Sequence, residues 1–93
     1  MIRVLIGEDS STVRFLLSKI LESDPDISVV GQAKNGVEVV ELSRVLKPDL
    51  ITMDIRMPHM NGFEATKEIM ANNPCPILVI SSSVNDEDLN IAF

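Results

Sequence analysis

Short apolar runs alternate with longer segments of helical periodicity along the chain. Four of the runs predict β-strands because each is short and rich in branched apolar residues. They occupy residues 2–6, 27–33, 50–54 and 77–80. Between them, apolar residues recur at every third or fourth position, which predicts helices that each bury one face. The predicted helices lie at about 11–23, 37–46 and 63–72, with a last one beginning near residue 86.

Two of these segments carry further expectations about burial. The first helix should bury one face, formed by Val13, Leu16, Leu17, Ile20 and Leu21. The run at 77–80 is wholly apolar, which is typical of a strand covered on both faces.

The regular alternation of strands and helices predicts an α/β fold. Its expected form is a doubly wound parallel sheet with helices on both faces and right-handed crossovers. The predicted strands begin 23 to 27 residues apart, so a fifth strand would begin at roughly residue 100. We therefore interpret residues 1–93 as a single domain, truncated to about four β/α units.

Composition narrows the class of protein. An apolar fraction of 45% with positive mean hydropathy indicates a folded chain. Fourteen acidic residues against eight basic ones argue against nucleic acid or an anionic membrane as the main partner. No apolar run approaches the length of about 20 residues that a membrane helix needs. The single cysteine, Cys75, fits a reducing compartment, and we expect a cytoplasmic protein.

Acidic side chains follow two of the predicted strands. Glu8 and Asp9 come after the first strand, and Asp54 ends the third. Ligands of open parallel sheets gather beyond the carboxyl ends of the strands, so three carboxylates would converge if these strands are neighbours. Their repulsion requires a raised pKa, a basic partner or a bound cation, and Mg²⁺ suits such oxygen donors. Alternatively, Asp9 or Ser10 simply caps the first helix.

The chain resembles the receiver domain of bacterial two-component response regulators. The segment from Asp54 to Gly62 matches the family pattern Asp-x-x-Met-Pro-x-x-Asp/Asn-Gly. Glu8 and Asp9 match its acidic pair, and Ser81 stands where the family keeps Ser or Thr. Other segments are similar to the subtype that precedes a chemotaxis protein-glutamate methylesterase domain. The resemblance implies a flavodoxin-like fold with strand order 2-1-3-4 over the residues present.

The resemblance also implies a role for each matching residue. Asp54 would be the phosphoacceptor for a phosphohistidine of a histidine kinase. Asp9, Glu8 through water, Asp54 and the backbone carbonyl of Arg56 would hold Mg²⁺. Ser81 would hydrogen-bond the phosphoryl group and act as a switch. The chain would therefore be a phosphoacceptor in a phosphorelay and not itself an enzyme, although a parent protein would carry the methylesterase domain.

Two departures from the family pattern change the expectation. Glu8 stands where many relatives have Asp, so the longer side chain should reach the ion by a different path. The family's lysine at the end of a fifth strand would lie beyond Phe93. We therefore expect the 93 residues to bind Mg²⁺ weakly and to accept phosphate poorly. The unguarded strand at 77–80 should form an edge through which copies of the chain associate.

Two other interpretations remain open. A phosphohydrolase of the haloacid-dehalogenase type also uses a nucleophilic Asp, but it needs Asp two residues later, where this chain has Arg56. A folded, chemically inert or self-associating fragment of a receiver is the stronger alternative.

The remaining polar features have simpler explanations. His59 is expected to be a solvated loop residue and Cys75 an inert thiol. Arg14 and Lys19 are placed on the solvated outer face of the first helix.

Overall fold

Four parallel strands form one sheet in the order β2-β1-β3-β4. This computed structural model describes residues 1–80, so Ser81 and the helix expected near residue 86 lie outside the described residues. The strands are β1 (Ile2–Gly7), β2 (Ile27–Ala33), β3 (Leu50–Asp54) and β4 (Ile77–Ile80). The helices are α1 (Ser11–Glu22), α2 (Gly36–Leu46) and α3 (Gly62–Asn72). The α/β class, the parallel sheet and the strand order are confirmed.

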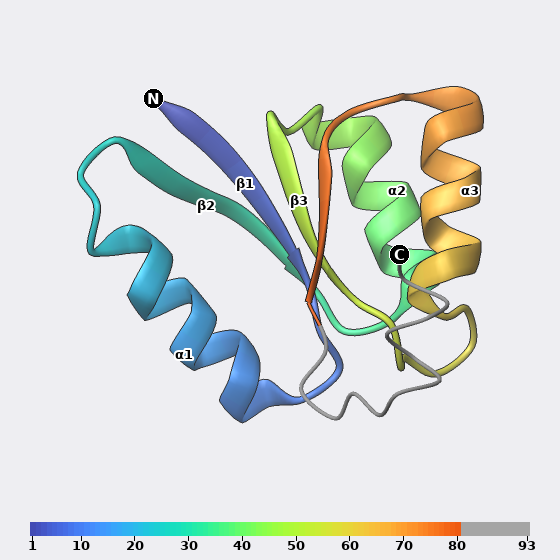
Figure 1. The fold of residues 1–93 in the computed structure, drawn as a ribbon, viewed down its shortest axis with the longest axis horizontal. Helices are drawn as coiled ribbons and strands as arrows, with labels where there is room; N and C mark the ends of the chain where they lie inside the picture. The colour runs from blue at the N-terminus through green and yellow to red at the C-terminus, as the bar shows by residue number, and fades with distance from the viewer. Residues whose placement is uncertain (81–93) are drawn as a thin grey trace.

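The helices cover the two faces of the sheet unequally. Figure 1 shows α1 on one face and α2 with α3 on the other. The buried core lies mainly on the side of α2 and α3. Its fully or nearly buried members are Leu5, Ala33, Val39, Ile51, Met53, Met57, Ala65 and Ile69. Within residues 1–80, no helix is both long enough and apolar enough to cross a membrane.

Each helix begins at a polar residue that caps it. The side chains of Ser10, Asn35 and Asn61 accept hydrogen bonds from backbone N–H groups three residues later. Such caps satisfy donors that the first helical turn leaves without a partner. At Asn61 the cap is reciprocal, because the Glu64 carboxylate accepts the Asn61 N–H. The caps fix where each loop at the carboxyl edge of the sheet gives way to a helix.

The predicted buried face of α1 was wrong in part. Leu16 and Ile20 are 52% and 66% exposed, and no residue of α1 is fully buried. The helix packs mainly against β2 and β1. Figure 1 shows no second helix of residues 1–80 beside α1 on this face, next to β3 and β4. A periodic pattern reveals an apolar stripe, but it does not say whether another element covers that stripe.

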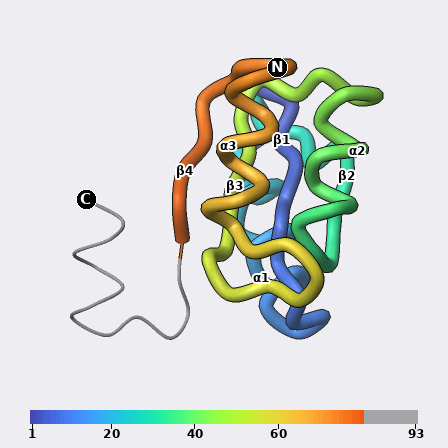
Figure 2. Tube along the Cα trace, turned by 90° about the vertical axis from the view of Figure 1, so that its right-hand side faces the viewer, coloured from blue at the N-terminus to red at the C-terminus, as the bar shows by residue number. Residues whose placement is uncertain are grey.

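Strand β4 is the outer strand of the sheet formed by residues 1–80. It pairs only with β3 there, and Figure 2 shows it at the outer side of the molecule. Leu78 is 54% exposed and Val79 is 38% exposed. The expectation of a strand covered on both faces is therefore wrong, whereas its position at the edge of the described sheet is confirmed.

Gly62 places the start of α3 against the end of β3. A Cβ built on Gly62 would collide with the backbone carbonyl oxygen of Asp54 and lie 2.9 Å from the Cα of Ile55. The Gly62 N–H also donates to the Ile55 carbonyl at 2.8 Å. A side chain here would have to push apart two backbone segments, because no flexible group is available to move.

We predict that Gly62→Ala lowers the free energy of unfolding by about 2–3 kcal/mol, because overpacking against backbone is costly. Gly31→Ala is the matched control, since a Cβ there meets only side-chain ends of Leu46 and Leu5. It should cost less than about 1 kcal/mol. Urea unfolding followed by far-ultraviolet circular dichroism measures both values. Equal losses for the two variants would contradict the role given to Gly62.

Candidate metal centre

Two neighbouring strands deliver the acidic residues to one place. Strands β1 and β3 run parallel, with Gly7 of β1 aligned with Met53 of β3. The next residue on each strand is therefore Glu8 or Asp54, at the same carboxyl edge of the sheet. The Glu8 N–H donates to the carbonyl of Ala33 at 2.9 Å, which extends the alignment with β2 by one residue. Strand order and register thus account for the juxtaposition.

The three carboxylates meet in one cluster. One carboxylate oxygen from each of Glu8, Asp9 and Asp54 lies within 4.8 Å of the others. Glu8 and Asp54 are 2% and 5% exposed, whereas Asp9 is exposed and marks the solvent side. Within residues 1–80, no other three acidic, histidine or cysteine side chains lie close enough together to share a metal ion. An oxygen-only set with one solvent-facing member fits Mg²⁺, which keeps several waters.

Burial and charge together act on Glu8. They raise the pKa of its carboxyl group from 4.5 to about 7. Loss of hydration on burial is the largest cause, the hydrogen bond from the Ser10 N–H opposes it, and the Asp54 carboxylate adds to the rise. Without a cation, Glu8 is therefore close to half protonated at neutral pH. The cluster relieves part of its repulsion by holding a proton that a metal ion would displace.

Backbone contacts hold the loop that follows Asp54. Its beginning and end are joined by the hydrogen bond from Gly62 to Ile55. The Gly36 N–H donates to the Met60 carbonyl at 2.9 Å, which ties this loop to the start of α2. Met57 is 8% exposed and packs in the core. His59 has φ of 68°, in the left-handed region that costs a side-chain-bearing residue about 1–2 kcal/mol.

The other predicted site residues lie around this loop or beyond the described chain. Arg56 is exposed in the loop, and the ligand role of its carbonyl stays a prediction. His59 is exposed, as expected for a solvated loop residue. Ser81 follows β4 but lies outside residues 1–80, so its predicted contact with a phosphoryl group stays a prediction.

Arg14 takes part in the site, so the prediction of a merely solvated side chain was wrong. It is half-buried, and its Nη1 donates to the carbonyls of Glu8 and Asp9 at 2.8 and 3.0 Å. One signal was available in the sequence, since a long basic side chain at the end of the first turn of a helix can reach back to the preceding loop. The hydrogen bond from the Gly36 N–H to the carbonyl of Met60 could not be predicted from any sequence pattern.

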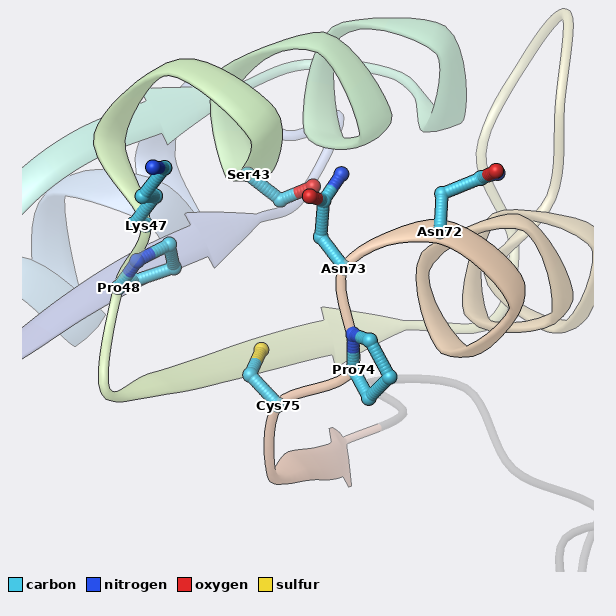
Figure 3. A pocket seen from close by; sticks show the side chains of 7 residues that line it. All are labelled: Ser43, Lys47, Pro48, Asn72, Asn73, Pro74 and Cys75. Atoms are coloured by element: carbon cyan, nitrogen blue, oxygen red, sulfur yellow. The ribbon is translucent and has the colours of Figure 1, made fainter.

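A separate cavity of about 360 Å³ lies away from the acids (Figure 3). It opens between the carboxyl ends of α2 and α3, near the starts of β3 and β4. Its lining consists of Ser43, Lys47, Pro48, Asn72, Asn73, Pro74 and Cys75. Burial raises the pKa of the Cys75 thiol, which disfavours the reactive thiolate. The cavity holds no carboxylate and lies at the opposite edge of the sheet from the cluster.

Sequence comparisons identify similar proteins along the whole chain. The family model described as "Response regulator receiver domain" matches residues 4–93. A protein-glutamate methylesterase/protein-glutamine glutaminase of Methanospirillum hungatei is 50% identical over 93 residues, which are all of this chain and 27% of that protein. Another, from Myxococcus xanthus, is 52% identical over 83 residues, 89% of this chain and 24% of that protein. The chain thus spans about a quarter of these relatives' length.

Solved structures show the same fold. The response regulator domain of Thermotoga maritima CheB has a TM-score of 0.90 and 47% identity, covering 98% of this chain and 69% of that one. A CheX–CheY complex of Borrelia burgdorferi, described with BeF₃⁻ and Mg²⁺, has a TM-score of 0.82 and 27% identity. That match covers 97% of this chain and 71% of the other.

We predict that the stability of the metal-free chain depends on pH through Glu8. The folded chain keeps a proton that the unfolded chain loses near pH 4.5. The free energy of unfolding should therefore fall as the pH rises from about 4.5 to about 7, by at most about 3 kcal/mol, and then level off. Urea unfolding with a chelator at about pH 5.5 and about pH 8 measures the difference.

Glu8→Gln should remove most of this pH dependence, because the amide does not titrate. Glu41→Gln, at an exposed position of α2, is the matched control and should keep the pH dependence. An unchanged slope in Glu8→Gln would contradict the assignment to Glu8.

Proposed function

The chain belongs to the response regulator receiver family, and on that premise we propose that Asp54 accepts a phosphoryl group from a phosphohistidine of a histidine kinase. The observation that carries the proposal is the cluster of Glu8, Asp9 and Asp54, with Asp54 at the end of a buried strand. The close approach of Gly62 to the backbone of Asp54 gives a physical reason for the glycine that the family pattern places eight residues after the aspartate. The chain acts here as an acceptor and not as an enzyme.

The transfer needs little chemistry from the protein beyond placement. A carboxylate oxygen of Asp54 attacks the phosphorus, the P–N bond to the imidazole breaks, and an aspartyl phosphate forms. Asp54 is 5% exposed, at the end of a buried strand. The hydrogen bond from the Gly62 N–H to the carbonyl of Ile55 holds the backbone directly after it. Holding the acceptor in line with the donor is a large part of the catalysis of such transfers.

A divalent cation completes this proposal. Asp9, Glu8 and Asp54, with the backbone carbonyl of Arg56, would hold Mg²⁺. When bound there, Mg²⁺ would supply positive charge to offset that of the phosphoryl oxygens. The chemistry of the donor set supports this choice, because the clustered side chains offer only carboxylate oxygens. Ser81 would donate a hydrogen bond to the phosphoryl group and couple it to the following segment.

The identity to methylesterase proteins supports a narrower proposal. We assign the chain to the receiver part of a cytoplasmic, chemotaxis-type regulator whose output is a protein-glutamate methylesterase. The chain spans only about a quarter of the length of those relatives. We therefore propose the methylesterase activity for a longer protein that contains this receiver, and not for residues 1–93 alone. For these 93 residues by themselves, we propose weak Mg²⁺ binding and slow phosphorylation, because no lysine stands where the family pattern places one.

The exposed strand β4 favours a second proposal, that copies of the chain associate with one another. Its apolar Leu78 and Val79 are exposed at the outer side of the described sheet, and the strand carries no charge. Unprotected edges of this kind pair with other chains. We propose that copies of the 93-residue chain associate through β4, whether or not they accept phosphate.

The first experiment tests Asp54 as the acceptor. The chain is incubated with Mg²⁺ and acetyl phosphate, and intact mass is measured. We expect one phosphate at low occupancy, lost in Asp54→Asn and kept in Asp26→Asn, an exposed aspartate between α1 and β2. Equal incorporation in Asp54→Asn would contradict the acceptor assignment, and near-full occupancy of the unmodified chain would contradict the proposed impairment.

Beryllofluoride provides a measurement that does not depend on the transfer rate. With Mg²⁺ it should shift the amide signals of residues 8–10 and 54–57 in nuclear magnetic resonance spectra. The same addition should leave Asp54→Asn unchanged. Absence of any shift in the unmodified chain would contradict the proposed function.

The self-association prediction is tested by placing a charge on the edge strand. Leu78→Lys should lower the average mass of the concentrated chain toward that of the monomer, because like charges would face each other across paired edges. Val45→Lys is the matched control, since Val45 is 73% exposed on α2, away from β4. Light scattering after gel filtration measures both variants. A monomeric unmodified chain at high concentration would contradict the proposal.

A further inference from the structure

The side chain of Arg14 contacts the backbone of the loop that carries Glu8 and Asp9. The guanidinium projects from the fourth residue of α1, and its Nη1 donates to the carbonyl oxygens of Glu8 and Asp9. The two distances, 2.8 and 3.0 Å, are those of good hydrogen bonds. Arg14 itself is anchored, because its N–H donates to the Ser10 carbonyl as part of the helix. The donor therefore sits on a rigid element.

These two carbonyls belong to the peptide groups on either side of the Asp9 Cα. Holding both peptide planes fixes the backbone angles of Asp9, and hence the direction in which its side chain leaves the chain. The second peptide is held at both ends, because the Ser10 N–H donates to the Glu8 carboxylate at 3.1 Å. Asp9 is exposed, so core packing does not fix its direction. The guanidinium supplies the constraint that packing does not.

The charge of Arg14 and its position have opposite effects on a bound cation. A nearby positive charge weakens binding of a divalent cation, so its removal would strengthen that binding. A constraint that aims Asp9 strengthens binding, because the ligand loses less freedom when the ion arrives. The sign of the effect of removing Arg14 therefore separates the two roles.

We infer that Arg14 is a positioning residue for the divalent-cation site, acting through the carbonyls of Glu8 and Asp9 to aim the Asp9 carboxylate. This inference rests on the proposed function. It adds a residue outside the acidic cluster to the machinery of the site. Because the hydrogen bonds end on carbonyl oxygens, Arg14 leaves the Asp9 carboxylate available to the ion.

The test is a Mg²⁺ titration of the 93-residue chain, read by calorimetry and by the amide signals of residues 8–10. The chain has no tryptophan or tyrosine, so these readouts replace intrinsic fluorescence. Arg14→Met, which keeps an apolar stem without donors, should bind Mg²⁺ about tenfold more weakly. Lys19→Met removes the same charge from a later turn of α1 and should bind as the unmodified chain does.

A second pair of variants separates positioning from general damage to the fold. Arg14→Lys keeps the charge but lacks the planar guanidinium, so it should bind more weakly than the unmodified chain and more tightly than Arg14→Met. In an Asp9→Asn background, Arg14→Met should cause no further loss, because the residue it aims is already changed. Circular dichroism confirms that each variant is folded.

The outcomes distinguish this inference from the proposed function. If the unmodified chain binds Mg²⁺ but Arg14→Met binds equally or more tightly, the positioning role is overturned and the proposed function stands. Losses that multiply in the double variant would also overturn it. If the unmodified chain binds no Mg²⁺, the proposed function fails, and this inference fails with it.

Discussion

Repulsion among three carboxylates at the ends of two adjacent strands is the constraint on which this structure depends. At a separation of at most 4.8 Å, the buried carboxylates of Glu8 and Asp54 repel each other, when both are ionised, by roughly 3.5 kcal/mol or more at an effective dielectric constant of about 20. Two of the three acids, Glu8 and Asp54, are almost fully buried, so water screens them poorly. A fold with this arrangement must hold the acids in place by other contacts, and it gains if a proton or a cation enters the cluster.

Hydrogen bonds of the backbone supply those contacts. The Glu8 N–H binds the Ala33 carbonyl, and the Gly62 N–H binds the Ile55 carbonyl. Peptide groups carry no net charge, so they fix the strand ends without cancelling the negative potential of the cluster. Arg14 brings a positive charge to the loop, but it too binds carbonyls. The site therefore keeps its carboxylates free of a basic side chain, which is the state that the proposed binding of a divalent cation and of a phosphoryl group requires.

The sequence pattern predicts a parallel sheet and acidic residues at the ends of two strands. The resemblance to receiver domains implied the strand order 2-1-3-4, which makes those two strands neighbours and brings the acids together. Alternating strands and helices leave few topologies, and neighbouring parallel strands end at the same edge. The burial of Leu16 and Ile20 was wrongly predicted, because periodicity does not reveal what packs on a stripe. The contacts of Arg14 and the left-handed backbone of His59 also escaped, since both depend on how a loop closes in three dimensions.

The carboxylate of Glu8 serves two places in the structure. It turns back to accept the N–H of Ser10, two residues later, while an oxygen still lies within the cluster. The hydrogen bond from Ser10 opposes the rise in the Glu8 pKa that burial causes. Glu8 thus braces the same peptide group that Arg14 holds from its other end, and both contacts constrain the loop that carries Asp9.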